Sequence, residues 1–461
     1  MKDCVASRSN CTPNGKRRDA RMSEPQLKRE LGLRDVTLFA TTCIVATRWI
    51  PAAAHAGPGS VTLWVLTAVL FMAPLAVSVG ALAAKYPGPG GLYTWTRNDF
   101  GPWHGFLAFF VFWVAIAVWF PSASIFYMSA GLSALPAPVA ALAENRAAML
   151  AVAIAAIWIA LGSNMIGVKV GKWTENIGGG ATWAVTLFLL GIAILVWRSR
   201  GSATAMDVVP KWNWSTVNFW SNLAYGMSGM ETVALMGAEI RDPLRTLPRA
   251  GWIASAFAAV FYTSATVALL VILSPAKINE VTGFREAGHT AAAVLHAGWI
   301  APVLSLLVLA TGLGQIGGLG TGVSRLPFAA GVDRMLPPAF ARVHPRWGTP
   351  HVSILWLGFV ATFLIAIYQL GDTMRAAYDE LVSLMVITGF LPYLYIFGSA
   401  WKAGKRISAL SGWLVTLLTI VCAVVPTPDV ANVWLFEAKL LGGAAGVIFA
   451  AWLLYRRAGR T

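Results

Sequence analysis

Charged residues are scarce in this chain of 461 residues. Asp, Glu, Lys and Arg together make up 12% of it, whereas a soluble domain usually carries about 25%. A water-soluble enzyme is therefore a poor interpretation of the composition. Cysteine is also scarce, and the four residues (Cys4, Cys11, Cys43 and Cys422) form no C-x-x-C pair. Two of them lie in apolar runs, so neither a disulfide scaffold nor a thiolate metal site is expected.

Motifs of intramembrane catalysis are missing as well. Such an enzyme would need paired aspartates, an H-E-x-x-H motif or a Ser/His pair within apolar runs. None occurs, and the six histidines fall at the ends of the apolar runs or between them. We therefore expect no catalytic activity, no metal site and no cofactor.

Hydrophobic residues make up 57% of the chain, and they come in runs of roughly 20, the length that a ~30 Å hydrocarbon layer demands of a helix. The sequence predicts a multi-pass membrane protein with twelve apolar segments. Their approximate ranges are 35–55, 61–83, 104–132, 147–167, 177–197, 217–239, 251–273, 300–324, 352–368, 377–400, 411–426 and 433–455.

The basic residues are distributed unevenly among the loops. Of the 35 Lys and Arg residues behind the net charge of +15, both tails and every second loop hold 26, and the opposite loops hold 7. This asymmetry predicts that both termini are cytoplasmic. The excess charge is thus a topology signal rather than a nucleic-acid-binding one. Residues 1–34 are expected to form a disordered basic cytoplasmic tail.

Two of the predicted spans are interrupted near the same depth. The first span contains the adjacent threonines Thr41 and Thr42, then Arg48 and Pro51, and the sixth contains Tyr225-Gly-Met-Ser-Gly-Met-Glu231. An intramembrane Arg is costly and proline removes a backbone donor, so both are tolerated mainly beside a cavity or a partner. Matching interruptions in two halves predict an inverted-repeat transporter with its binding site at the breaks. The alternative is that these residues only kink or pack helices.

Small residues also recur at helical spacing in later spans. Gly314, Gly318 and Gly322 form one such series, and Gly442 and Gly446 form another. This spacing predicts close packing of helix backbones.

Three loop motifs resemble those of the amino acid-polyamine-organocation superfamily of permeases. The first is Lys85-Tyr-Pro-Gly-Pro-Gly-Gly-Leu-Tyr-Thr-Trp95 with Phe100-Gly-Pro102, after the second span. The second is Gly229-Met-Glu231 with Glu239-Ile-Arg-Asp-Pro243 and Leu247-Pro-Arg-Ala250. The third is Arg325-Leu-Pro-Phe328, Asp333-Arg-Met-Leu-Pro337 and His344-Pro-Arg-Trp-Gly-Thr-Pro350. The resemblance covers roughly residues 31–455.

The resemblance implies an all-α membrane protein of twelve helices with the LeuT-like fold, two inverted five-helix repeats plus two peripheral helices. On this chain the transporter core would be 35–400, with repeat one at 35–197 and repeat two at 217–400. Residues 401–461 would hold the peripheral helices and a short cytoplasmic tail. The family cycles between outward-open and inward-open states.

Substrate-binding positions follow from the same resemblance. Ala46, Thr47 and Arg48 occupy the family's glycine-rich break in helix 1, where backbone amides hold a carboxylate. Residues 226–229, among them Gly226, Ser228 and Gly229, occupy the break in helix 6, where carbonyls hold an ammonium group. Tyr225 falls where many members place an aromatic gate, and Glu231 matches their helix 6 glutamate.

Two departures from the family pattern stand out. Arg48 replaces flexible backbone by a guanidinium, which could pair with a substrate carboxylate, stand in for a coupling cation between helices 1 and 8, or pair structurally with an acid such as Glu231. Some members use a helix 5 lysine in proton coupling, but residues 177–197 contain no Lys, Arg or His. Glu231 is therefore the candidate proton-coupling group.

The predicted function is secondary transport of amino acids or related organic solutes across the cytoplasmic membrane, by proton coupling or exchange. A polyamine or amine transporter and a transporter-like nutrient sensor without flux are the alternatives. The major facilitator architecture is disfavoured because the loop at 240–250 is short. The expected partners are a small amino acid or amine, membrane lipids and protons, and no nucleic acid.

Overall fold

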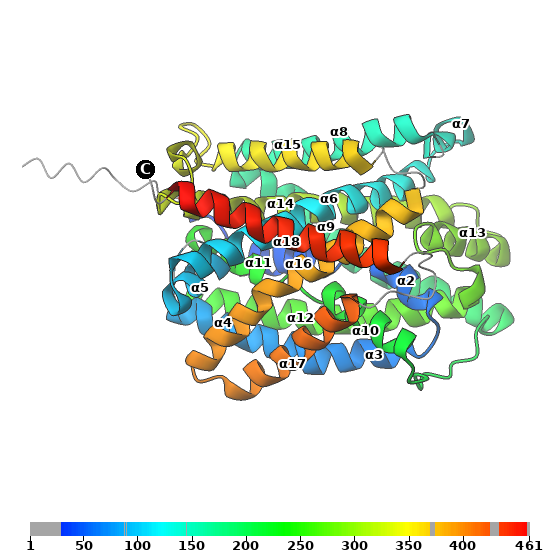
Figure 1. Ribbon diagram of the computed structural model, residues 1–461. Coiled ribbons are helices and arrows are strands. Elements are labelled where there is room, and N and C mark those ends of the chain that lie inside the picture. The colour runs from blue at the N-terminus through cyan, green and yellow to red at the C-terminus, as the bar shows by residue number, and fades with distance from the viewer. Residues whose placement is uncertain are drawn as a thin grey trace, which may run out of the picture.

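The computed structural model describes residues 29–86, 88, 90–143, 145–368, 374–424 and 433–458. Within these ranges the regular structure is helical, and the only bridge between extended segments joins Leu31 to Ile240. The long helices run side by side along one direction of the molecule (Figure 1). Most of the predicted basic tail, together with Pro87 and Pro89 of the first motif, lies outside the described residues.

Most of the helices follow one another closely, with longer connections between α9 and α10 and between α14 and α15. In chain order they are α1 (Leu33–Ile44), α2 (Trp49–His55), α3 (Ser60–Thr67), η1 (Ala68–Met72), α4 (Ala73–Lys85), α5 (Leu92–Phe100), α6 (Pro102–Leu132), α7 (Ala137–Ala140), η2 (Ala141–Ala143), α8 (Arg146–Met165), α9 (Val168–Arg200), α10 (Trp214–Gly226), α11 (Met230–Leu235), η3 (Gly237–Glu239), α12 (Pro243–Ile272), η4 (Pro275–Lys277), α13 (Gly283–Leu295), α14 (Ile300–Val332), η5 (Pro338–Ala341), α15 (His351–Tyr368), α16 (Met374–Lys402), α17 (Arg406–Val424) and α18 (Val433–Ala458).

Each predicted apolar segment falls on one helix or on two or three consecutive helices. In the described part of the chain, eight helices are long and apolar enough to cross a membrane, and α1 with α2 makes a ninth span bent by 43°. α3, η1 and α4 form a single one of these spans, Ser60–Lys85. The all-helical membrane architecture is therefore confirmed, while the count of twelve spans and the inverted repeat stay predictions.

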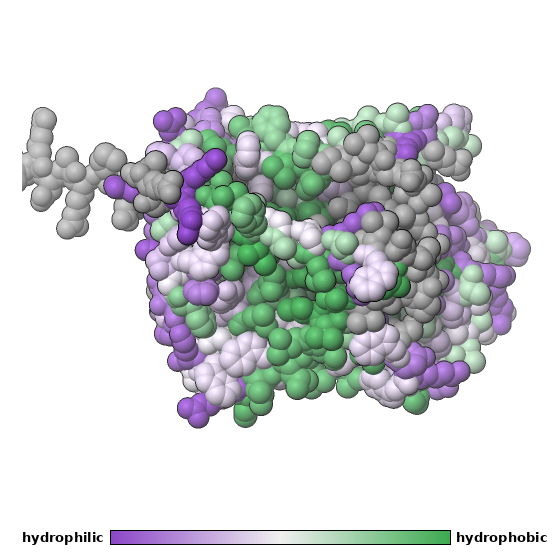
Figure 2. Space-filling view, viewed as in Figure 1, coloured by the Kyte–Doolittle hydropathy of each residue, from purple (hydrophilic) through white to green (hydrophobic). Residues whose placement is uncertain are grey.

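The outer surface is apolar across its middle. Figure 2 shows hydrophobic residues over the central part of the visible face and hydrophilic residues toward both ends. Large apolar side chains are exposed on separate helices, including Ile159 of α8, Leu187 of α9 and Phe363 of α15. Such a belt is unfavourable in water and is expected where lipid chains are the solvent.

The core is built around α6 and α14. Of the most apolar stretch of α6, 83% is buried. α14 approaches α9 so closely that a Cβ built on Gly178 would lie 2.4 Å from the Cα atom of Gly314. The packing predicted from the first glycine series is therefore confirmed. In the second series, nothing in the described residues lies within 4 Å of a Cβ built on Gly442 or Gly446, so the packing predicted there is wrong.

Short helices mark the two ends of the molecule. α5 lies at one end, on the left of Figure 1, and α13 lies at the other, on the right. We call these the α5 end and the α13 end. α11 extends toward the α5 end, where a Cβ built on Gly91 would lie 2.9 Å from Leu235. α2 belongs to the other half, since His55 contacts the carbonyl of Ile278 near α13.

Candidate functional site

Two interrupted helices meet in the middle of the bundle, at the breaks that the sequence predicts. α1 ends at Ile44 and α2 begins at Trp49, while α10 ends at Gly226 and α11 begins at Met230. Gly229 makes their approach possible. Its φ is +115°, which favours glycine, and a Cβ on it would lie 2.6 Å from the carbonyl oxygen of Cys43.

A tyrosine from α12 joins the two breaks. The N–H of Ala46 donates to the Tyr262 hydroxyl at 2.8 Å, and that hydroxyl lies 2.7 Å from the carbonyl oxygen of Gly226 and 3.0 Å from that of Ile44. Its ring stacks on Trp64, with centroids 4.2 Å apart. Backbone groups that the helices leave unpaired are thus satisfied by one buried side chain. Tyr262 is not predictable as a site residue from the sequence, because a tyrosine in an apolar run carries no sign of its partners.

A glutamine from α14 holds the break in the first span from the opposite side. Gln315 donates from Nε2 to the carbonyl of Val45 at 3.2 Å, and its Oε1 accepts from the hydroxyl of Tyr127 in α6 at 2.6 Å. The sequence analysis did not single out Gln315 either. The extended segment after Ile44 is therefore fixed by α6, α12 and α14 together.

A small buried cavity lies between the two breaks. The space open to the centre of a water molecule is about 30 Å³, enough for water but not for an amino acid. Six of the eight predicted site residues line it: Ala46, Tyr225, Gly226, Ser228, Gly229 and Glu231. The predicted positions Thr47 and Arg48 are not among the lining residues, although Thr47 is fully buried beside them.

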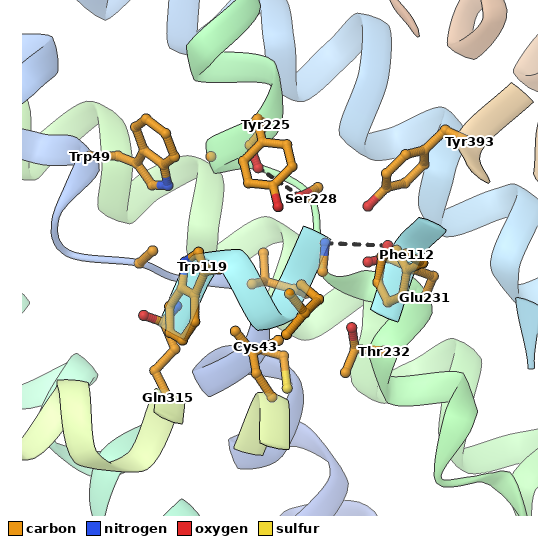
Figure 3. A pocket seen from close by; sticks show the side chains of 16 residues that line it. Cys43, Trp49, Phe112, Trp119, Tyr225, Ser228, Glu231, Thr232, Gln315 and Tyr393 are labelled. Carbon is orange, nitrogen blue, oxygen red and sulfur yellow. Dashed lines mark hydrogen bonds between the residues drawn. The ribbon is translucent and has the colours of Figure 1, made fainter. Parts of the chain in front are cut away.

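Glu231 is the carboxylate of the cavity. Its side chain is 1% exposed, and its Oε2 accepts the N–H of Gly229 at 3.2 Å. Figure 3 shows the Tyr393 hydroxyl directed toward the Glu231 carboxylate. That hydroxyl is buried and makes no hydrogen bond within the described residues. The cavity therefore offers a carboxylate and an unused hydroxyl to a polar ligand group.

Aromatic side chains cover the cavity. Tyr225 packs edge-on against Trp49, with centroids 6.2 Å apart, and against Phe390 at 5.8 Å. Trp119 and Phe112 of α6 form a further part of the wall (Figure 3). Because the enclosed space is so small, a solute can enter only when some of these rings move.

Arg48 lies behind this aromatic wall. It is 3% exposed, and its guanidinium carbon is 4.6 Å from the ring centroid of Trp49 and 5.8 Å from that of Trp119. Nη1 donates to Ser122 at 2.8 Å, and Nη2 contacts the sulfur of Met385 at 3.8 Å. Nε has no partner in the described part of the chain.

This geometry bears on the three roles considered for Arg48. Among the described residues no carboxylate lies within 4 Å of its guanidinium, so the structural pair with Glu231 is not formed. Its partners come from α6 and α16 rather than α14, and the link from the first break to α14 is made by Gln315. In the described chain the guanidinium therefore makes no hydrogen bond to α14, the eighth predicted span, as a cation between the first and eighth spans would.

Toward the α5 end, the helix after the second break is tied down by a buried ion pair. Arg325 of α14 binds Glu239 of η3 through Nε at 3.1 Å and Nη2 at 2.7 Å, and the two side chains are 1% and 0% exposed. The backbone N–H groups of Glu30 and Leu31 also donate to the carbonyl of Glu239. These contacts hold three elements together on the α5 side of the cavity: η3, α14 and the segment that precedes α1.

Comparison with known proteins agrees with this architecture. A family model described as amino acid permease matches residues 31–437. The chain belongs to this family. The resemblance to the amino acid-polyamine-organocation superfamily is thereby confirmed, and the permease is a multi-pass membrane protein.

Several curated relatives match the permease over most of their length. It is 24% identical over 455 residues to an uncharacterized transporter of Legionella pneumophila, covering 93% of this chain and 97% of the relative. It is 25% identical over 396 residues to the serine/threonine exchanger SteT of Bacillus subtilis, covering 82% and 84%. It is 23% identical over 412 residues to the low-affinity putrescine importer PlaP of Escherichia coli, covering 84% and 83%.

Proposed function

We propose that this permease is a secondary transporter that carries amino acids or related organic solutes across the cell membrane by alternating access. The observation that carries the proposal is the pair of facing breaks around a buried cavity that contains Glu231. Broken helices expose backbone donors and acceptors to a solute near the middle of the membrane. The names of the relatives, an exchanger of serine and threonine and an importer of putrescine, support small organic solutes as the cargo.

The charges around the cavity favour a solute that carries a carboxylate and an ammonium group. Glu231 lines the cavity, whereas Arg48 lies behind Trp49 and Trp119 with no acid within 4 Å in the described chain. A buried charge without a counter-charge is costly, and a substrate carboxylate near the first break would offset that cost. Residues 46–48 are therefore proposed to hold the carboxylate. Gly226, Ser228, Gly229 and Glu231 are proposed to hold the ammonium group.

Amine transport is a second candidate. Glu231 lines the cavity directly and Arg48 does not, an arrangement that also suits a solute with ammonium groups and no carboxylate. PlaP, one of the relatives, is named as a putrescine importer. The two candidates differ in whether a carboxylate on the solute is required.

The proposed orientation places the α5 end in the cytoplasm. Lys85, Arg97, Lys402 and Arg456 belong to the loops and helix ends that carry most of the basic residues, which is the side that the positive-inside rule assigns to the cytoplasm. Both termini would then be cytoplasmic. The α13 end would face the outside.

The proposed repeats each begin with a broken helix, at α1 with α2 and at α10 with α11. Repeat one (35–197) would then run from α1 to α9, and repeat two (217–400) from α10 to α16. α17 and α18 would be the peripheral pair, and the most apolar stretch of α18 is only 17% buried.

A competition panel in proteoliposomes tests the function. Purified protein would be reconstituted into vesicles, and the uptake of external radiolabelled L-serine would be measured with and without a pH gradient. Unlabelled amino acids, dicarboxylates and putrescine would be added as competitors. Competition by amino acids alone supports the first candidate, and competition by putrescine supports the second. Binding without flux for every solute would contradict transport and indicate a sensor.

A further inference from the structure

A second buried carboxylate lies outside the substrate cavity. Glu175 of α9 is 4% exposed, and its Oε1 has no hydrogen-bond partner in the described chain. Its backbone carbonyl accepts the hydroxyl of Thr42 in α1 at 3.2 Å, which fixes this turn of α9 against α1. Glu175 does not line the cavity. In the sequence, Glu175 falls in the loop just before the predicted span 177–197, where an acidic residue is not a sign of a buried site.

A cation of α14 close to Glu175 is already paired with another acid. Arg325 gives Nε and Nη2 to Glu239 in a two-pronged contact, and Nη1 donates to the carbonyl of Thr321 at 2.6 Å and to the hydroxyl of Ser324 at 2.9 Å. Among the described residues, no guanidinium nitrogen of Arg325 lies within 4 Å of a carboxylate oxygen of Glu175. The guanidinium charge is therefore neutralised by Glu239, and Arg325 stabilises an ionised Glu175 only weakly.

The hydroxyl of Thr321 is the other unsatisfied group at this place. Thr321 belongs to α14 and lies near Glu175, and its hydroxyl is buried and makes no hydrogen bond among the described residues. It can donate to an ionised carboxylate or accept from a protonated one. Two buried polar groups, one of them acidic, thus lie close together, and each has an atom without a hydrogen-bond partner in the described chain.

The other charged and titratable groups around Glu175 do not supply a counter-charge. α1 contributes Asp35, which is acidic and pairs with Lys172 at 3.5 Å, and Cys43, which is neutral as a thiol. η3 contributes Glu239 and α14 contributes Arg325. An ionised Glu175 would therefore add a third negative charge to a cluster whose two cations, Arg325 and Lys172, are already paired with Glu239 and Asp35. Burying such a charge costs far more than burying the neutral acid.

We propose that Glu175 is a proton-binding site of the transport cycle, distinct from the substrate cavity, that holds its proton while the Glu239–Arg325 pair is buried and releases it to cytoplasmic water when that pair opens. The inference rests on the proposed transport function and adds the coupling ion. The step is a simple dissociation, in which the O–H bond of the carboxylic acid breaks, the proton goes to water and the carboxylate keeps the electron pair.

The position of Glu175 suits this role. Glu239 ends the helical segment that begins at the second break, and Arg325 ties it to α14. Any opening of the α5 end that moves η3 away from α14 must break that pair and admit water beside Glu175. Cys43 lines the cavity together with Glu231, and the neighbouring Thr42 donates its hydroxyl to the backbone carbonyl of Glu175, so the substrate site and the proton site flank the same turn of α1. Binding of substrate and binding of the proton can then both affect the position of α1.

Infrared spectroscopy tests the protonation itself and does not depend on transport. Purified wild-type protein, Glu175→Gln and the control Glu280→Gln, which changes an exposed acid in the loop before α13, would be compared in lipid at neutral pH. We expect the Glu175→Gln protein alone to lose a carbonyl band of protonated carboxylic acid. A spectrum identical to that of the wild type would overturn the proposal.

Proteoliposomes test the coupling. With radiolabelled L-serine as the probe and a pH-sensitive dye inside the vesicles, we expect Glu175→Gln to lose both serine accumulation driven by a pH gradient and serine-dependent proton uptake. Serine exchange at equal pH should persist, because it needs no net proton movement. Glu175→Asp, which restores an acid, should regain coupling. Proton uptake at the wild-type ratio in Glu175→Gln would refute the site.

The remaining outcomes also decide the matter. If the Glu175→Gln protein does not fold, the Thr321→Val protein is measured in its place. We expect the infrared band of the protonated carboxylic acid to change in frequency in that variant. An unchanged band counts against the proposal. If a sodium gradient instead of a proton gradient drives uptake and Glu175→Gln abolishes that, the site is a cation site and the proton assignment fails. If the wild type moves no solute of the panel, the proposed function fails, while the infrared result still stands for or against Glu175.

Discussion

The hydroxyl of Tyr262 accepts the N–H of Ala46 at 2.8 Å and lies 2.7 Å from the carbonyl oxygen of Gly226, so one side chain of α12 connects the two helix breaks. Its partners are buried backbone groups, which are costly when unpaired. The relative position of the two breaks therefore depends on α12 as well as on the broken helices themselves.

The first prediction concerns this contact. Tyr262→Phe removes the shared hydroxyl and leaves buried backbone groups unpaired, a cost of about 1–3 kcal/mol. We expect a lower thermal unfolding temperature and a slower initial rate of solute uptake. Tyr395→Phe is the matched control, because among the described residues its hydroxyl forms a hydrogen bond only with His104, at 3.0 Å and away from the breaks. Wild-type stability and uptake in Tyr262→Phe would show that the link is dispensable.

Arg48 provides the second prediction. In Arg48→Ala we expect the affinity for amino acids to fall by about tenfold or more, which corresponds to about 1.4 kcal/mol, because the charge proposed to attract the carboxylate is gone. Affinity for putrescine should not fall. Ser122→Ala is the control, since it removes the hydrogen bond to Nη1 but keeps the charge. Affinity is measured by competition in proteoliposomes.

An unchanged solute panel in Arg48→Ala would remove Arg48 from both substrate binding and coupling. Arg48→Lys refines the result. Lysine keeps the charge but cannot reproduce the planar stacking against Trp49 and Trp119. A lysine variant that transports like the wild type would show that charge alone matters.

Glu231 is the subject of the third prediction. Glu231→Gln keeps the size of the side chain and an oxygen for the N–H of Gly229, but it removes the negative charge from the cavity. We expect weaker binding of solutes that carry an ammonium group, by about tenfold or more, and a loss of the pH dependence of that binding. Glu280→Gln, on the surface, should behave as the wild type does. Transport and pH dependence that both survive in Glu231→Gln would exclude it as a coupling group.

The contact between α9 and α14 gives the fourth prediction. Gly314→Val places a branched side chain where the backbone of Gly178 leaves no room, and overpacking of this kind typically costs about 1–3 kcal/mol. We expect a clear drop in thermal stability in detergent. Gly446→Val makes the same change where nothing in the described chain lies within 4 Å, and its stability should stay near that of the wild type. Equal stability of the two variants would contradict the packing.

Some features of the fold follow from the sequence alone. The lengths of the apolar runs are set by the thickness of the hydrocarbon layer, so the helices lie where the runs predict them. The breaks are also predictable. Proline and an arginine in one span, and two glycines around Ser228 in the other, are poorly compatible with a continuous helix in lipid, and the structure interrupts both spans there.

The site residues were only partly predictable. Ala46, Tyr225 and Glu231 line the cavity as expected, because the chain geometry of a break places its own residues around the opening. Arg48 belongs to the same break, yet its long side chain leaves the cavity and passes behind Trp49 to α6 and α16. The direction of a side chain depends on neighbours from distant segments, which local sequence does not encode.

The sequence by itself determined that this protein is a membrane-spanning permease with two interrupted helices, because run length, loop charge and loop motifs are local properties of the chain. Only the tertiary structure decided that Tyr262 joins the breaks, that Arg325 is paired with Glu239, and that Glu175 is buried with no ion-pair partner among the described residues. Each of these depends on which helix faces meet. In a bundle whose helices are apolar on nearly every side, the hydrophobic pattern cannot say which faces those are.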